Sequence, residues 1–318
     1  MALKPDIQQV LLAQGAVFPE AALTDPGASR AYLDRSRTPR ARPTPEAVAF
    51  VDELRIDGGP RVRIYRPDAD GLFPVIVFLH GGGWVMGDLD MHDATCRKLA
   101  NGVGAVVLNV DYRLAPEHPY PAALEDAIAA TQWIHEHARE YGGDPQRLVL
   151  AGTSAGGNLA VAVSLKLRDA GGIKPRLQVL IYPVIDSDMQ TGSHREYATG
   201  YSLEHRQMQW FLAQYVPDES LRRHPFISPA HATSLAGLPA TITITAECDP
   251  LRDEAEQFAA RLRRDGVPSE LTRYDGQIHG FIGMYGIVED ADLAIEKLCR
   301  DIAVYVGGSD EGKRGCLE

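Results

Sequence analysis

The sequence predicts an α/β protein with a mostly parallel central sheet, helices on both faces and a helical cap. From Pro74 onward, continuous apolar runs alternate with stretches of helical periodicity, as in a parallel sheet that is buried on both faces. The chain has 318 residues, 45% of them hydrophobic, which is enough for a sizeable core in one large domain with insertions or in two smaller ones. The interval between Tyr182 and Pro239 is longer than a crossover requires and predicts the cap, with an ordinary packed crossover helix as the alternative.

Each element is expected from its local pattern. Two short segments, 6–13 and 28–37, have helical spacing and form an N-terminal appendage within residues 1–45. The strictly alternating strand Arg61–Arg66 is expected to pair antiparallel with the 48–56 stretch and to form a sheet edge. Six buried strands follow, at Val75–Leu79, Ala105–Val110, Leu148–Ala151, Leu177–Tyr182, Ala240–Ala246 and Ser269–Tyr274. Helices are expected at Ala94–Ala100, Ala122–Tyr141, Asn158–Arg168, Arg252–Arg264 and Ile287–Val304. The main domain therefore covers 46–182 and 229–306, with an inserted cap at 183–228 and a flexible tail at 307–318.

Charge and cysteine content limit the function classes. The net charge of −11, with Lys and Arg scattered along the chain, disfavours binding to nucleic acid or to anionic membranes. The first residues lack an apolar signal region, and no stretch approaches the ~18–20 apolar residues that span a bilayer, so we expect a cytoplasmic protein. The four cysteines are too dispersed for a disulfide scaffold or a zinc motif, and the first three are expected to pack as small hydrophobes: Cys96, Cys248, Cys299 and Cys316. Neither a metal nor an organic cofactor is expected.

A Gly-x-Ser-x-Gly turn at Gly152–Gly156 lies between a predicted strand and a predicted helix. Small residues at both ends permit a sharp turn that exposes the serine hydroxyl, which is the geometry of a nucleophile elbow. Ser154 is therefore the candidate nucleophile. On these five residues alone, a serine that only caps the helix is an equally good interpretation.

A second glycine-rich turn, His80–Trp84, follows directly on the strand Val75–Leu79. Its successive glycines allow backbone N–H groups to face one point without an intervening Cβ, as an oxyanion hole requires. The N–H group of the residue after the nucleophile, Ala155, is expected to be a further donor. A flexible turn is the alternative, but two such turns at the carboxyl edge of one parallel sheet favour a site.

A serine nucleophile needs a base and a residue that orients the base. Among the ten histidines, His279 follows the last predicted strand and comes after both Ser154 and the best acid candidate, Asp249. We prefer Asp249 to the neighbouring Glu247 because its side chain is shorter and because Pro250 biases it to an extended conformation. The resulting order of serine, aspartate and histidine is that of the α/β-hydrolases.

These residues resemble the hormone-sensitive-lipase-like group of α/β-hydrolases, which includes many bacterial carboxylesterases. The resemblance extends from about Val62 to Val304 and rests on five stretches: His80–Trp84, Asp111–Ala122, Gly152–Gly156, Asp249–Glu254 and His279–Phe281. It implies a triad of Ser154, Asp249 and His279, and an oxyanion hole lined by the N–H groups of Gly82, Gly83 and Ala155. It also implies a cap built from the N-terminal residues and the region 183–228. Thr153 stands where many relatives have Asp. In this respect the chain resembles a threonine branch of the family, and its substrate range stays open. The family resemblance also suggests a homodimer in which the last strand and the helix after it pair with those of a second copy.

We therefore expect a serine ester hydrolase that acts on a neutral small-molecule ester with a short or medium acyl chain. An amide hydrolase or deacetylase with the same triad is an alternative, and so is a non-catalytic receptor on the same scaffold, which the presence of His279 disfavours. The pocket wall is expected to contain Trp84, Tyr201, Trp210, Phe211 and Tyr215, with Trp84 packed behind the pocket as an alternative. Arg113 and Glu117 are expected to tie the loop below the His80–Trp84 turn rather than to touch substrate.

Overall fold

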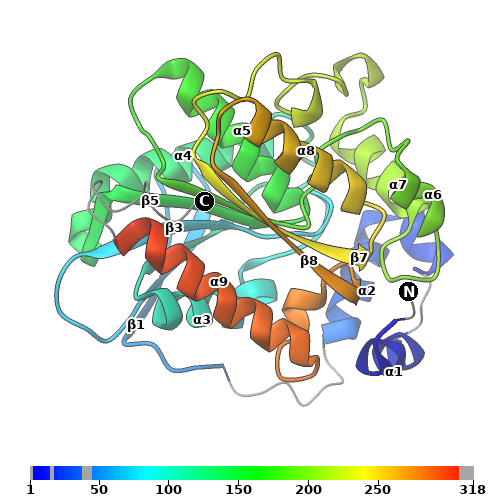
Figure 1. Ribbon diagram of the computed structural model, residues 1–318, viewed down its shortest axis with the longest axis horizontal. Coiled ribbons are helices and arrows are strands. Elements are labelled where there is room, and N and C mark those ends of the chain that lie inside the picture. Colours follow the sequence, from blue (N-terminus) through cyan, green and yellow to red (C-terminus); the bar gives the residue numbers. More distant parts are fainter. Residues whose placement is uncertain (1–2, 15–17, 38–44, 308–318) are drawn as a thin grey trace.

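The computed structural model describes residues 3–14, 18–37 and 45–307, and at its centre lies an eight-stranded sheet (Figure 1). The strands are β1 (Phe50–Arg55), β2 (Arg61–Arg66), β3 (Phe73–Leu79), β4 (Val106–Asp111), β5 (Gly143–Thr153), β6 (Leu177–Ile181), β7 (Ala240–Cys248) and β8 (Ser269–Ile278). They are arranged in the order β1-β2-β4-β3-β5-β6-β7-β8. β2 pairs antiparallel with β1 and β4, and every other pairing is parallel. The predicted α/β class is confirmed, and the predicted hairpin forms one edge of the sheet.

Helices cover both faces of this sheet because its buried strands are apolar on both sides. Along β3, Val75 and Val77 face one core and Ile76 and Phe78 face the other. The first core is covered by α4 (Ala122–His137), α5 (Ala155–Ala170) and α8 (Arg252–Arg264). The second is covered by α3 (Asp93–Val103) and α9 (Glu289–Gly307), which lie side by side in Figure 1. This sandwich holds the ends of the strands in fixed positions.

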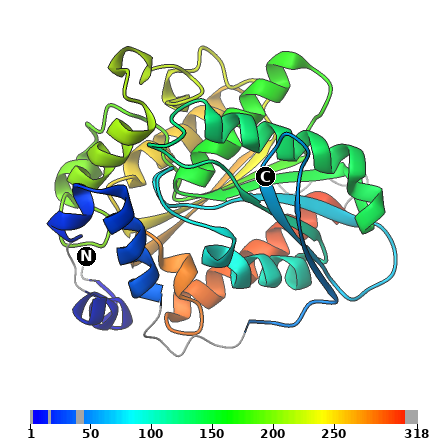
Figure 2. The same cartoon turned by 180° about the vertical axis from the view of Figure 1, so that it is seen from behind.

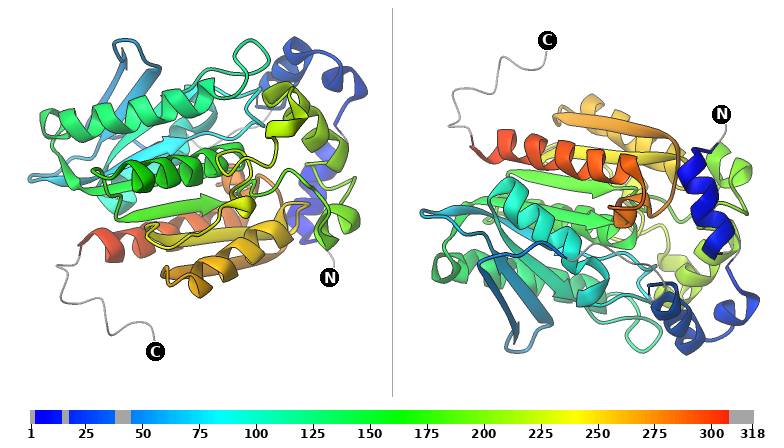
Figure 3. Two further views of the ribbon diagram at one scale, coloured as in Figure 1. Left: turned by 90° about the horizontal axis from the view of Figure 1, so that it is seen from above. Right: turned by 90° about the horizontal axis from the view of Figure 1, so that it is seen from below.

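Four further helices gather at one end of the molecule although they are far apart in the sequence (Figures 2 and 3). They are α1 (Pro5–Gln14), α2 (Pro26–Arg37), α6 (Gly192–Glu196) and α7 (His205–Tyr215). Single 3₁₀ turns complete the described elements: η1 (Glu20–Leu23), η2 (Leu89–His92), η3 (Ala138–Tyr141), η4 (Glu219–Leu221), η5 (Pro229–His231) and η6 (Phe281–Met284). Within the described ranges, no helix combines the length and the apolarity needed to cross a bilayer.

Several element ends differ from the prediction. β5 begins at Gly143, five residues early, because Gly143 pairs with Phe73 ahead of a register shift in β3. β8 continues through a polar stretch to Ile278, which pairs with Cys248 after a second shift. The predicted helix 122–141 changes to a 3₁₀ turn after His137. Of the predicted tail 307–318, residues 308–318 lie outside the described residues.

A buried carboxylate joins α8 to the segment that follows β6. Glu254 accepts hydrogen bonds from the Ile185 N–H at 2.7 Å and the Asp186 N–H at 3.3 Å, and its other oxygen contacts His194 Nε2 at 3.0 Å. His194 in turn contacts His205 at the start of α7, so the network extends from the core to the end of the molecule at which α1, α2, α6 and α7 gather. Burial raises the pKa of the Glu254 carboxyl.

We expect Glu254→Ala to lower the free energy of unfolding by about 3 kcal/mol, because it leaves buried N–H groups and His194 without their acceptor. Urea denaturation followed by circular dichroism measures this change. Glu219→Ala is the control, since Glu219 pairs with Arg222 at the surface with 79% of its side chain exposed; its effect should stay within about 0.5 kcal/mol. Equal stability of the two variants would contradict a structural role for Glu254.

Candidate active site

The turn between β5 and α5 holds Ser154 in a strained conformation. Its φ is 54° and its ψ is −119°, in a region that non-glycine residues rarely adopt. A Cβ on Gly156 would lie 1.9 Å from the carbonyl oxygen of Leu79, and one on Gly152 would lie 2.3 Å from the backbone of Gly156. Gly156 is therefore required where α5 packs against β3, and Gly152 where the end of β5 packs against the start of α5. The turn has the geometry expected of a nucleophile elbow.

The structure brings Ser154, His279 and Asp249 into one chain of hydrogen bonds. Asp249 Oδ2 lies 2.7 Å from His279 Nδ1, and His279 Nε2 lies 3.0 Å from Ser154 Oγ. An ionised carboxylate accepts, so Nδ1 carries the proton and Nε2 is free to accept from the serine hydroxyl. Asp249 is fully buried, and its second oxygen accepts the Leu251 N–H at 2.9 Å, which fixes the carboxylate plane. This geometry allows His279 to remove the serine proton.

The other acidic residues near Asp249 have different partners. Glu247 Oε2 accepts the N–H of Gly276 at 2.7 Å, within β8. Asp253 accepts the N–H of Ser193 at 2.8 Å, and Glu254 contacts His194. Burial raises the pKa of the neighbouring Cys248 thiol, which does not favour a second nucleophile. Asp249 is the acid that the geometry places on His279.

The glycine-rich turn after β3 lies next to Ser154. Gly82 and Gly83 have φ values of 116° and 60°, and a Cβ on Gly83 would lie 2.3 Å from the Phe211 ring. Tyr112 supports the turn from below: its ring stacks on His80 at 4.1 Å, and its hydroxyl donates to the His80 carbonyl at 2.8 Å. Glycine is therefore required where α7 approaches the loop.

Arg113 and Glu117 make structural hydrogen bonds and do not line the cavity, as expected. Arg113 bonds to Asp126 on α4, with Nε at 2.9 Å. Glu117 accepts hydrogen bonds from both terminal nitrogens of Arg30 on α2, which also donates to the carbonyl oxygens of Val85 and Ala115. Arg30 thus connects Glu117 to Val85, directly after the glycine-rich turn, although it carries no motif and the sequence did not single it out.

A cavity of about 240 Å³ opens in front of Ser154. It is lined by glycines of the turn after β3, by Ser154 and His279, and by residues of α2, α7 and several loops: Leu33, Gly81, Gly82, Gly83, Met86, Met91, His92, Thr153, Ser154, Tyr182, Ser202, Leu203, Gln207, Met208, Phe211, His279, Gly280, Gly283, Met284 and Ile287. Among these described lining residues there is no Lys, Arg, Asp or Glu, so the cavity suits a neutral ligand.

Of the five aromatic residues predicted for the wall, the structure places Phe211 there and the other four elsewhere. Trp84 has a φ of 60° and is buried against the Tyr215 ring, with centroids 4.5 Å apart. Tyr201 packs edge-on against Tyr197, and Trp210 lies beside Phe211 on a half-buried face of α7. The residues of α7 that line the cavity are Gln207, Met208 and Phe211, which lie one or two turns before Tyr215. The type of side chain alone does not predict which turn of the helix faces the cavity.

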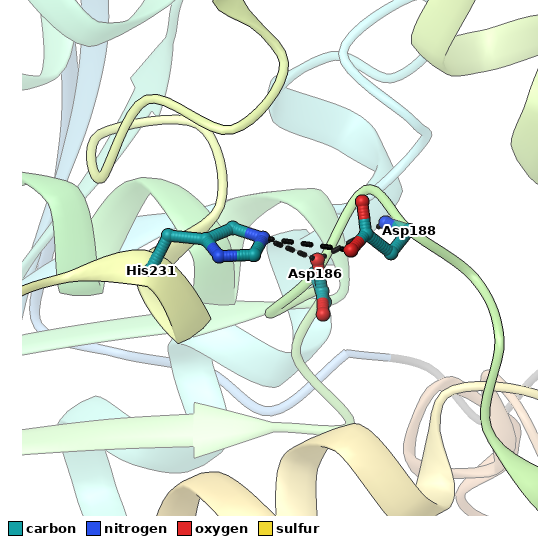
Figure 4. Close-up of side chains that lie close together, drawn as sticks. All are labelled: Asp186, Asp188 and His231. Atoms are coloured by element: carbon teal, nitrogen blue, oxygen red, sulfur yellow. Dashed lines mark hydrogen bonds and ion pairs between the residues drawn. The ribbon is translucent and has the colours of Figure 1, made fainter.

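One group of side chains outside the cavity has ligand types that suit a metal. Asp186, Asp188 and His231 each offer one atom, and these atoms lie within 4.8 Å of one another (Figure 4). His231 Nε2 contacts Asp186 Oδ1 at 3.2 Å, and both oxygens of Asp188 pair with Arg223. The Arg223 guanidinium lowers the pKa of Asp188. The charge of Arg223 on Asp188 and the contact of His231 with Asp186 favour a network of protein–protein contacts here.

Cys96, Cys248 and Cys299 are buried free thiols, as predicted, and Cys316 lies outside the described residues.

The fold and this arrangement define the class of protein. A family model described as "alpha/beta hydrolase fold" matches residues 76–283, and the chain belongs to this family.

Relatives within it are named as esterases. The chain is 44% identical to the carboxylic ester hydrolase LipN of Mycobacterium tuberculosis over 81% of this chain and 70% of that protein. It is 40% identical to esterase LipI of the same organism, over 92% of this chain and 93% of that protein. Among solved structures, an ester hydrolase from the Lake Arreo metagenome has a TM-score of 0.90 and 36% identity, over 96% of this chain and all of that chain. A thermostable esterase of Pseudomonas putida has a TM-score of 0.89 and 34% identity, over 97% of this chain and 99% of that chain.

Proposed function

We propose that the protein is a serine carboxylic ester hydrolase of the hormone-sensitive-lipase-like group, in its threonine branch. The observation that carries the proposal is the hydrogen-bonded chain from Asp249 through His279 to Ser154, at the mouth of a cavity without charged side chains. Relatives named LipN and LipI are described as a carboxylic ester hydrolase and an esterase, which supports the same class of reaction.

The proposed reaction has two steps. His279 Nε2 takes the Ser154 proton as Oγ attacks the acyl carbon, and the same proton passes to the leaving alcohol. Water, activated by His279, then attacks the acyl-enzyme and releases the acid. The N–H groups of Gly82, Gly83 and Ala155 are proposed to receive the oxyanion, which the glycine conformations and the helix N-terminus at Ala155 favour. Asp249 holds the imidazole in the required tautomer.

The experiment that tests this function is hydrolysis of p-nitrophenyl esters of increasing acyl length beside matching aryl amides. Esters of short and medium acids should be cleaved, with kcat/KM higher than for the amides. Faster cleavage of the amides would favour the amide hydrolase, and binding without turnover of either would favour the receptor.

The helical end of the molecule is proposed to act as a cap that sets acyl-chain preference. α2 contributes Leu33 to the cavity, and α7 contributes Gln207, Met208 and Phe211. Residues 1–45 and 183–228 would thus form the cap over a catalytic domain of 46–182 and 229–306.

We expect Phe211→Ala to raise the ratio of kcat/KM for the hexanoate ester to that for the acetate ester by about tenfold, because it enlarges the cavity next to Gly83. Steady-state kinetics across the acyl series measures the ratio. Trp210→Ala is the matched control, since Trp210 is the next residue on α7 and does not line the cavity. An unchanged ratio in Phe211→Ala, or the same shift in Trp210→Ala, would contradict the assignment of Phe211 to the wall.

A homodimer through β8 and α9 is also proposed. Among the described residues β8 is the last strand of the sheet, and β7 is the strand with which it pairs. An edge strand of this kind can pair with a second copy of the chain. We expect light scattering at micromolar concentration to give twice the chain mass of 34.7 kDa, and a monomer mass would contradict the proposal.

A further inference from the structure

Methionines are concentrated in the wall of the cavity. The chain has six, and four of them line this one site. They come from four separate segments: Met86 from the loop after β3, Met91 from η2, Met208 from α7 and Met284 from η6. Their convergence is a property of the folded site, because no two of them belong to one element.

Methionine differs from the other apolar residues in its shape and flexibility. Its side chain is unbranched, has three rotatable bonds and ends in a polarisable thioether, so it fills gaps of irregular shape. Met86 and Met208 are buried, whereas Met91 and Met284 are half-buried. The wall therefore has two members packed into the core and two that have space to move.

The part of the cavity nearest the triad is built differently. Thr153 Oγ1 and His92 Nε2 are hydrogen-bonded at 3.2 Å, and the Tyr182 ring packs on His279 with centroids 4.6 Å apart. These groups and the glycine turn lie beside Ser154 and His279 and are held by contacts within the protein. The cavity wall thus combines fixed groups next to the nucleophile with flexible methionine side chains.

We propose that Met86, Met91, Met208 and Met284 form a deformable wall that admits neutral esters of widely different shape, including branched and ring-bearing groups. The proposal rests on the proposed esterase function and deepens it. A cavity of about 240 Å³ is small for a ligand site, since such sites commonly enclose about 300–1,000 Å³. Rotation of the thioethers provides the additional space without rearrangement of the backbone.

The test replaces the four methionines by leucine, which has a similar volume but is branched and less flexible. Two substrate series are used, one for each side of the ester: p-nitrophenyl esters from acetate to cyclohexanecarboxylate, and acetates of increasingly bulky alcohols. In at least one series the ratio of kcat/KM for the bulkiest to the smallest ester should fall about tenfold in the quadruple variant. Met189→Leu is the matched control, since Met189 is buried outside the cavity and its variant should keep the wild-type ratio.

Two outcomes would overturn the proposal: wild-type ratios in both series for a folded quadruple variant, or an equal fall in Met189→Leu. If the quadruple variant does not fold, the double variant at the half-buried Met91 and Met284 carries the same test. Hydrogen peroxide gives a second readout, because it transfers one oxygen to each thioether, forming a polar sulfoxide and water. Oxidation should lower the ratio in the wild type and not in the leucine variant, and equal sensitivity would contradict the proposal. Failure of the esterase proposal is distinguishable, because the wild type would then cleave no ester in either series.

Discussion

Ser154→Ala is expected to lower turnover by about 10⁶-fold while the protein stays folded, because no other hydroxyl is placed on His279 Nε2 in the described structure. Kinetics with a short p-nitrophenyl ester measures the loss. A fluorophosphonate should add once to the wild type, at Ser154, and not to the variant; peptide mass spectrometry locates the adduct.

Ser164→Ala is the matched control for this variant. Ser164 is buried on α5, the helix that begins directly after Ser154, but it does not line the cavity. It should retain both turnover and labelling. Label on another residue, or full activity in Ser154→Ala, would refute the acyl-enzyme at Ser154.

Asp249→Asn is expected to reduce turnover by about 10⁴-fold with the fold unchanged, by analogy with the serine proteases. The amide preserves the shape of the side chain but stabilises the wrong tautomer of His279, so that Nε2 carries a proton and no longer accepts one from Ser154. Steady-state kinetics, with circular dichroism to monitor the fold, measures the effect.

Glu247→Gln is the comparison for Asp249→Asn. Glu247 lies two residues earlier, and its contact is with the backbone of Gly276 rather than with His279. It should retain most of the turnover. Near-normal activity in Asp249→Asn together with an inactive but folded Glu247→Gln would show that a different acid orients the histidine.

The sequence predicted the framework of the site because the framework depends on local patterns. Apolar runs located the buried strands, and the helix predicted at Arg252–Arg264 has those bounds in the structure. The predicted strand ends are wrong where a strand continues through polar residues because its backbone still pairs with a neighbouring strand. The end of β8 is polar, yet Ile278 pairs with Cys248, and this pairing places His279 at the site. Position after a strand, together with the Gly-x-Ser-x-Gly turn and the order of the residues along the chain, selected Ser154, Asp249 and His279, which the structure then brings together.

The cavity wall was harder to predict because it depends on which turn of a helix faces the site. Phe211 and Tyr215 are one turn apart on α7 and both are buried, but Phe211 reaches the glycine turn whereas Tyr215 stacks on Trp84. The methionines of the wall carry no motif, and their common location arises from four segments that meet in space. Arg30 was missed for the same reason, since its partners are carbonyl oxygens and Glu117, far along the chain.

The long separation between the members of the triad has a consequence for how the chain acquires activity during folding. Ser154 and His279 are 125 residues apart, and β6, β7 and β8, which lie between them in the sequence, stand in this order beside β5 in the sheet. Parallel pairings of this kind close large loops, and such non-local contacts form slowly. We therefore expect the helical circular dichroism signal to return early in refolding, and ester hydrolysis to return when β8 has paired. Recovery of catalysis thus reports completion of the sheet, and it distinguishes native molecules from compact intermediates that retain their helices.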